Sequence, residues 1–114
     1  MTRAKGRDAD RLADMLEAVE RIQGWSGRGS DDMYRAAVLH ELMIIGEAAS
    51  ALSEGFRGAH PEVPWRQIIG QRVMLAHHCW RADWPQVERT IKVDLPSLSK
   101  ALQQIMKGER RPER

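Results

Sequence analysis

Apolar residues recur every three or four positions along most of the chain, which is the spacing of a helix that buries one side. Near the N-terminus this spacing predicts a helix that Asp8 or Asp10 caps and Gly24 ends, followed by a loop over residues 27–30. The apolar stripe of this helix consists of Leu12, Met15, Leu16, Val19 and Ile22.

A longer helix is predicted over residues 31–53, with Ser30 as its N-cap. Its main stripe is Tyr34, Val38, Leu42, Ile45, Ala49 and Leu52, widened by Ile44, Ala48 and Ala51. Because this apolar surface is wider than one stripe, we expect more than one face to be covered, and we predict a homodimer that forms through helices. Gly46 costs roughly 1 kcal/mol relative to alanine in mid-helix, so close packing is the expected compensation. Gly55 and Gly58 should end the helix.

Prolines and a glycine divide the middle of the chain. Pro61 and Pro64 frame a turn, and Pro64 suits the first position of a short helix over residues 65–69. Gly70 can serve as the residue that ends this helix, and a further helix is predicted over residues 71–81.

The last helical segment is predicted to start at Asp83 and to be interrupted by Pro96. Proline removes one backbone donor, so the helix should kink or split near Asp94. Its apolar positions are Val87, Ile91, Leu95, Leu98, Leu102 and Ile105. Since no segment shows strand alternation, the predicted fold is an all-α bundle of four or five helices, with a long antiparallel helix pair and a kinked C-terminal helix.

Length and composition fit one helical domain over residues 8–106, between a flexible N-terminus (1–7) and a basic flexible tail (107–114). The single cysteine excludes an intrachain disulfide and fits a reducing compartment. No apolar run approaches the roughly 20 residues of a membrane helix, and the charged N-terminus is not followed by an apolar signal core. These features predict a cytoplasmic protein without a membrane segment.

The net charge gives little support for nucleic-acid binding. It is +2 at pH 7, and the tail alone, with four basic and two acidic residues, accounts for 4 − 2 = +2. Arginine supplies 14 of the 18 basic residues, which slightly favours bidentate phosphate contacts, although a high-GC genome gives the same bias.

Residues 70–80 concentrate the chemistry of the chain. They contain Arg72, which can hold a phosphate by its charged fork, and His77, which can move protons near neutral pH. The same residues could form an ordinary half-buried helix, in which the arginine pairs with a carboxylate and the histidine lies satisfied in an interface. The run His77-His78-Cys79 lacks the i, i+4 spacing of helical metal ligands, so no metal is assigned, and a buried inert Cys79 is favoured over a nucleophile.

Several runs in this sequence resemble the HepT-like toxins of the HEPN-domain superfamily. They are Ile44-Ile45-Gly46-Glu47-Ala48-Ala49, Leu52-Ser53-Glu54, Phe56-Arg57, His60-Pro61-Glu62-Val63-Pro64-Trp65-Arg66 with Ile68-Ile69-Gly70, and Trp84-Pro85 to Asp94-Leu95-Pro96. The resemblance covers residues 8–106, and residues 60–70 are its most specific part.

The family's signature is an arginine, four residues, a histidine, one residue and a tyrosine. Arg72 and His77 fall on the arginine and histidine positions, whereas Cys79 stands at the tyrosine and Val73 replaces a residue that is usually polar. The same arginine-to-histidine spacing recurs at residues 35–40, so Arg72 and His77 are preferred for their family context and not for their spacing.

The resemblance implies a metal-independent RNA endonuclease with no cofactor. It makes His77 the general acid or base and Arg72 the phosphate ligand, in a composite cleft built by two protomers. Five helical residues turn through about 140°, so these two residues meet only at a distorted helix start or across a dimer. Val73, Cys79 and Glu47 are possible secondary residues of the site. Three tryptophans near the motif could stack on bases, but packing is favoured: Trp65, Trp80 and Trp84.

The resemblance also implies a partner. It makes the chain the toxin of a type VII-style toxin–antitoxin pair, neutralised by a small nucleotidyltransferase with an MNT domain. Related toxins accept AMP on the motif tyrosine, and Cys79 at that position predicts that this modification is absent here. The alternative, favoured by Val73 and Cys79, is a catalytically degenerate HEPN adaptor that binds the nucleotidyltransferase or nucleotides without cleaving RNA.

Overall fold

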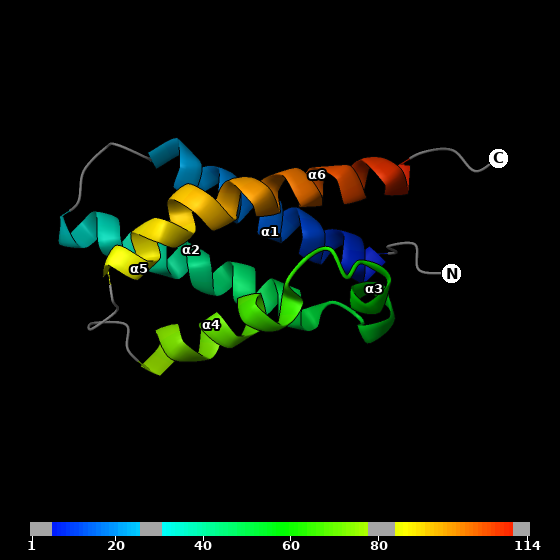
Figure 1. Ribbon diagram of the computed structural model, residues 1–114, viewed down its shortest axis with the longest axis horizontal. Helices are drawn as coiled ribbons and strands as arrows, with labels where there is room; N and C mark the ends of the chain where they lie inside the picture. The colour runs from blue at the N-terminus through cyan, green and yellow to red at the C-terminus, as the bar shows by residue number, and fades with distance from the viewer. Residues whose placement is uncertain (1–5, 26–30, 78–83, 111–114) are drawn as a thin grey trace.

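The computed structural model describes residues 6–25, 31–77 and 84–110, and this part of the chain contains helices and turns without strands (Figure 1). The elements are α1 (Gly6–Trp25), α2 (Asp32–Ala51), α3 (Glu54–Ala59), α4 (Trp65–His77), α5 (Trp84–Arg89), the π-helical turn η1 (Thr90–Asp94) and α6 (Leu95–Arg110). Since α5, η1 and α6 follow one another without a break, they form one long irregular helix. The predicted all-α bundle is confirmed.

The core lies between α1, α2 and α6, and α4 packs on α2 (Figure 1). The buried residues of α1 are Leu12, Met15, Ala18, Val19 and Ile22, which confirms most of the predicted stripe. On α2 the buried apolar residues are Val38, Leu42, Ile45, Ala48 and Ala49. The wide apolar surface of α2 is therefore covered within one chain, by α1 on one side and α4 on another, and does not by itself require a second copy.

The start of α1 ties two distant parts of the chain together. The Asp8 carboxylate does not cap its own helix but accepts hydrogen bonds from the Ser53 backbone N–H (2.9 Å) and hydroxyl (2.8 Å). Ser53 Oγ in turn accepts from the Phe56 N–H at 3.2 Å, as the N-cap of α3. Asp8 thereby fixes α3 against the beginning of α1.

Three glycines that were predicted to end helices lie inside them. Gly24 lies within α1, which continues to Trp25, and Gly55 and Gly58 lie within α3. The reason is burial: Trp25 packs against the core and Phe56 is 1% exposed. Burying a large apolar side chain contributes about 1.5–3 kcal/mol, more than the roughly 1 kcal/mol that a helical glycine costs.

The N-cap of α2 is Asp31, not the predicted Ser30. The Asp31 carboxylate accepts from the Tyr34 N–H at 2.8 Å, which satisfies one of the free donors in the first turn of the helix. Ser30 lies outside the described residues. At the other end, α2 stops at Ala51 because Leu52, 2% exposed, adopts an extended conformation.

The predicted break at Gly70 is also wrong. Helix α4 runs from Trp65 to His77 as one continuous helix, with Gly70 exposed in its interior. Ile68 and Ile69 on the preceding turn pack against the core, which holds the helix in place across the glycine. Residues 78–81 of the predicted second helix lie outside the described residues.

The predicted irregularity near Asp94 is confirmed, and it takes the form of a π-helical turn. The Leu95 N–H donates to the Thr90 carbonyl five residues earlier, immediately before Pro96, which has no N–H to donate. The Thr90 hydroxyl donates to the Gln86 carbonyl at 3.2 Å. Helix α6 then runs to Arg110, four residues beyond the predicted domain boundary.

Candidate functional site

The motif that the sequence singles out lies on the C-terminal half of α4. Positions 72, 73 and 77 belong to this helix, whereas the side chains of residues 72–77 and all of Cys79 and Trp80 lie outside the described part of the structure. Position 72 is the eighth residue of α4, so it does not occupy a distorted helix start. In a regular helix, positions 72 and 77 lie about 140° apart around the axis and roughly 7.5 Å apart along it.

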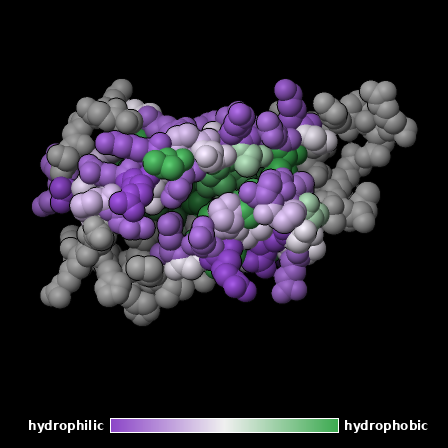
Figure 2. All heavy atoms as spheres, viewed as in Figure 1, coloured by the Kyte–Doolittle hydropathy of each residue, from purple (hydrophilic) through white to green (hydrophobic). Residues whose placement is uncertain are grey.

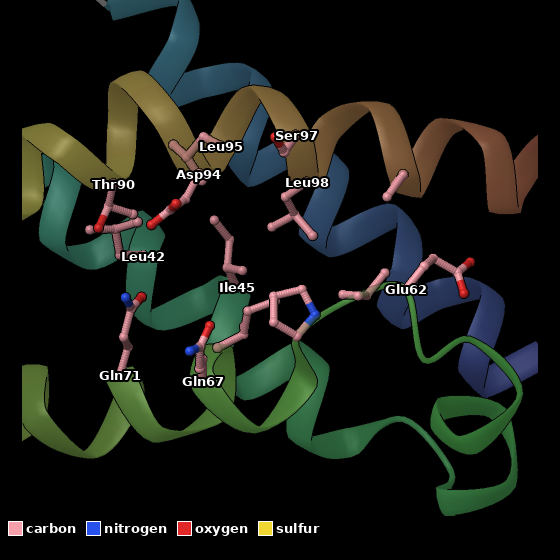
Figure 3. Close-up of a pocket in the computed structure, with 14 residues that line it drawn as sticks. Leu42, Ile45, Glu62, Gln67, Gln71, Thr90, Asp94, Leu95, Ser97 and Leu98 are labelled. Atoms are coloured by element: carbon pink, nitrogen blue, oxygen red, sulfur yellow. The ribbon is translucent and has the colours of Figure 1, made fainter.

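A groove runs along one side of α4. It lies between α4 and the η1–α6 segment, encloses about 160 Å³, and has Leu42 and Ile45 of α2 as its floor (Figure 3). Figure 2 shows this apolar floor as a strip between more polar rims. The rim includes Gln67 and Gln71 from α4, and the groove is further lined by Glu62, Val63, Pro64, Ile68, Thr90, Asp94, Leu95, Ser97, Leu98 and Ala101.

A second, more open depression lies on another side of α4, where α3 meets it. Its volume is about 520 Å³, and its lining contains two arginines, Arg57 and Arg66, and two glycines, Gly58 and Gly70. The other lining residues are Glu54, Trp65 and Ile69. The corner beneath it is tied together, because Trp65 Nε1 donates to the His60 carbonyl at 2.9 Å and the rings of Phe56 and His60 are in tilted contact, with their centroids 4.6 Å apart.

Position 77 continues the depression side of α4, and position 72 lies at the boundary between the two sides. Position 72 follows Ile68 of the groove by four residues, a rotation of about 40°, and Trp65 of the depression by seven residues, a rotation of about 20°. Position 77 follows Gly70 of the depression by seven residues, a rotation of about 20°. A straight α4 therefore separates the arginine and histidine positions of one chain.

The remaining predicted site residue, Glu47, is exposed on α2 and lines neither hollow. The structure does not bring it together with the described parts of the groove or the depression. Four residues that line the two hollows were not predicted as site residues: Gln67, Gln71, Arg57 and Arg66. The two glutamines are spaced i, i+4 on a helix, and this spacing is the signal that could have drawn attention to the groove.

The second arginine-to-histidine spacing, at residues 35–40, has a structural explanation. The Arg35 guanidinium lies over the Trp84 ring at 4.9 Å, and the same ring meets Tyr34 edge-on at 6.2 Å. This cation–π contact fastens α2 to α5. His40 is exposed. Trp65 is 8% exposed and Trp84 packs against the core, so packing is confirmed for these two tryptophans.

One buried carboxylate was missed by the sequence reasoning. Glu41 of α2 is 7% exposed, and its Oε1 lies 3.1 Å from Nε of Arg21 on α1. The contact is close enough for an ion pair, although its angles do not make a well-aligned hydrogen bond. This pair joins the two long helices and lines neither hollow, so we assign it a structural role and not a role in the candidate site.

Two kinds of feature are absent from the residues that the structure describes. Within them, no group of three or more His, Cys, Asp or Glu side chains is arranged to hold a metal ion. Among the described helices, none combines the length and apolar character needed to cross a bilayer.

Comparisons with known proteins give a consistent result. The family model described as "Ribonuclease HepT-like" matches residues 10–105. The chain is 33% identical over 104 residues to a protein of Thermococcus cleftensis named "Probable ribonuclease HepT", covering 86% of this chain and 94% of that protein. It is 33% identical over 94 residues to "Putative RNase TTE0752" of Caldanaerobacter subterraneus subsp. tengcongensis, covering 81% and 84%. No solved structure gives a significant match. The chain belongs to the HepT-like ribonuclease family.

Proposed function

We propose that this chain is a metal-independent RNA endonuclease whose active site combines Arg72 of one protomer with His77 of another. The observation that carries the proposal is the continuity of α4 from Trp65 to His77. A regular helix separates positions 72 and 77 by about 140°, so a site that needs both residues is completed most simply across a twofold axis. Membership of the HepT-like ribonuclease family supplies the reaction class.

In this mechanism, His77 takes the proton of an RNA 2′-hydroxyl, whose oxygen attacks the adjacent phosphorus. A bond forms between O2′ and phosphorus, the bond between phosphorus and O5′ breaks, and a proton passes to the departing O5′. Arg72 holds the phosphate oxygens and stabilises the charge that develops on them. General acid–base assistance of this kind contributes about 10²–10⁴-fold to the rate.

The dimer of this proposal forms around α4 and not around α2. Helix α2 is covered by α1 and α4 within the chain. Positions 72 and 77, which the proposed dimer must bring together, lie on the C-terminal half of α4. In a twofold interface, the same patch meets itself, so one pair of helices creates two equivalent sites.

The partner in this proposal is a small nucleotidyltransferase with an MNT domain, which acts as the antitoxin. Cys79 stands where related toxins carry the tyrosine that accepts AMP. A thiolate is a soft nucleophile and a poor acceptor for a nucleotidyl group compared with a phenol, so neutralisation proceeds by steric binding. Intact-mass measurement after co-expression should show the unmodified chain. An added AMP that maps to residues 72–80 would contradict this prediction.

The second candidate function is a catalytically degenerate adaptor that binds the nucleotidyltransferase without cleaving RNA. The specific observation in its favour is the pair of departures from the family signature, Val73 and Cys79. Loss of a polar side chain next to Arg72 removes a group that could orient substrate.

Cleavage of RNA in the presence of a chelator separates the two candidates. The wild-type protein should cleave, and His77→Ala should lose about 10²-fold or more of the rate while keeping its helical circular dichroism. The matched control is His40→Ala, because His40 is exposed and has the same spacing from an arginine. Equal cleavage by wild type and His77→Ala would indicate contamination and leave the adaptor function standing.

A further inference from the structure

We propose that the depression between α3 and α4 is a binding track for the phosphates of single-stranded RNA, held by Arg57 and Arg66. This inference rests on the proposed nuclease function and extends it to substrate outside the cleavage site. It assigns a role to a surface that contains neither Arg72 nor His77.

The two arginines project from a corner whose geometry is fixed. Arg57 lies in the last turn of α3 and Arg66 in the first turn of α4. Between them, the hydrogen bond from Trp65 Nε1 to the His60 carbonyl and the tilted ring contact of Phe56 with His60 tie the two helices together. A preorganised pair of guanidinium groups loses less conformational freedom on binding a phosphate than a flexible pair does.

Neither arginine has an anionic partner among the described residues, whereas two other arginines of the bundle pair with carboxylates. Arg11 pairs with Asp14 at 3.4 Å, Arg21 pairs with Glu41, and Arg35 lies over Trp84. Nε of Arg57 is buried without a hydrogen-bond acceptor, as is Nε of Arg11, but Arg57 also lacks an ion pair among the described residues. A buried donor without an acceptor is unfavourable, and a phosphate oxygen is the acceptor that a guanidinium binds best.

The surface beside the arginines lets a chain approach closely. Gly58 and Gly70 both line the depression, and a Cβ built on either would meet no other atom within 4 Å. The depression is wide and open, which suits a polymer that passes through it more than a single small anion.

The direction of the track follows from the register of α4. Arg66 and position 77 are eleven residues apart, which places them within about 20° around the helix and roughly 16 Å apart along it. Gly70 lies between them near the same line. A strand that follows this side of α4 from Arg66 therefore arrives at the histidine position, where the proposed cleavage occurs.

One carboxylate lies beside the two arginines in the depression, and its substitution should change RNA affinity in the opposite direction. Glu54, exposed in the first turn of α3, also lines the depression and makes no ion pair with Arg57 or Arg66. Its charge repels a phosphate, so removing that charge should strengthen RNA binding by a few fold.

The experiment measures fluorescence anisotropy of a labelled 12-nucleotide single-stranded RNA in a His77→Ala background, over a series of salt concentrations. The double variant Arg57→Gln/Arg66→Gln should weaken binding about 10-fold or more at low salt and lower the slope of log affinity against log salt by about 1.4. Glu54→Gln should bind more tightly. Arg66→Gln alone, a change at an exposed residue, should give about half of the slope change.

The matched control is Arg89→Gln/Lys100→Gln, which removes the same charge from exposed positions on α5 and α6. Control affinity should stay close to that of the parent. An equal loss in the control would overturn the proposal, because net charge alone would explain it. Unchanged RNA binding by the Arg57/Arg66 double variant would overturn it too, and if that variant instead lost the nucleotidyltransferase, the depression would be a protein-docking surface.

The outcomes separate this inference from the proposed function. If wild type binds RNA through Arg57 and Arg66 but does not cleave it, the nuclease proposal fails and the track remains. If wild type cleaves RNA and the double variant binds as tightly as its parent, the track fails and the nuclease proposal remains.

Discussion

The two sides of α4 present different surroundings to whatever binds there. The groove side has an apolar floor of Leu42 and Ile45 beneath a rim of uncharged amides and a few carboxylates. The depression side has two arginines that form no ion pair with the described residues, and two glycines at which an added Cβ would have open space. One helix of ordinary length thus divides a surface suited to apolar contact from a surface suited to phosphate, and changes on the two sides should affect different measurements.

The largest effect is expected where positions 72 and 77 must act together. Arg72→Ala and His77→Ala should each abolish most cleavage as homodimers. In a heterodimer of the two variants, one composite site contains both substitutions and the other contains neither, so a purified heterodimer should recover about half of the wild-type activity.

This heterodimer can be isolated by co-expression of the two variants with different affinity tags. The control is each variant carrying both tags, which should remain inactive. If the heterodimer is as inactive as the homodimers, arginine and histidine act within one chain, and α4 does not separate them as its straight geometry requires.

A smaller effect, on stability, is expected from the groove side. Leu42→Ala should lower the free energy of unfolding by about 2–3 kcal/mol, because Leu42 is 7% exposed and its truncation enlarges the groove floor. RNA affinity of the folded variant should not change. Chemical denaturation and anisotropy measure the two quantities.

The control for Leu42→Ala is Gln71→Ala on the rim of the same groove, which should alter stability by no more than about 0.5 kcal/mol. A marked loss of RNA affinity in either variant would show that the groove side also contacts RNA. The contrast between the two sides of α4 would then disappear.

The smallest effect is expected at Gly70. Gly70→Ala should raise the free energy of unfolding by about 0.5–1 kcal/mol, since alanine is the better helix former and its Cβ meets no other atom within 4 Å. The same methyl group would stand in the proposed RNA track, so RNA affinity should fall by a few fold.

Gly24→Ala on α1 is the matched control for these two effects, the gain in stability and the loss of RNA affinity. Gly24 is also helical and also faces open space, but it does not line the depression. It should stabilise the protein by a similar amount and leave RNA affinity unchanged. A drop in RNA affinity for Gly24→Ala, or none for Gly70→Ala, would count against the track.

Sequence patterns predicted those features of this protein that depend on neighbours within a few turns of helix. The stripe of α1 was visible because residues three and four apart lie on one side of a helix. The irregular turn before Pro96 was visible because proline lacks a backbone donor wherever it occurs. Family membership was likewise visible from short ordered runs such as residues 60–70, and the family match over residues 10–105 confirms it.

Helix ends at glycine were decided by the tertiary structure instead. At Gly24, Gly58 and Gly70 the local preference against helix amounts to roughly 1 kcal/mol. It is outweighed by side chains nearby that pack against the core, among them Trp25 and Phe56. Such burial depends on what the rest of the chain places opposite, and no local pattern records it.

The same limit applies to the contacts that build the candidate site. The sequence by itself determined that an arginine and a histidine stand five residues apart in a helical family context. Only the tertiary structure decided that α4 is continuous, so that the two positions lie about 140° apart around it, and that α3 brings Arg57 beside Arg66. Asp8 and Ser53, 45 residues apart, meet for the same reason. Contacts over such separations arise from the packing of whole helices, which minimises exposed apolar surface, and not from the preferences of the residues that touch.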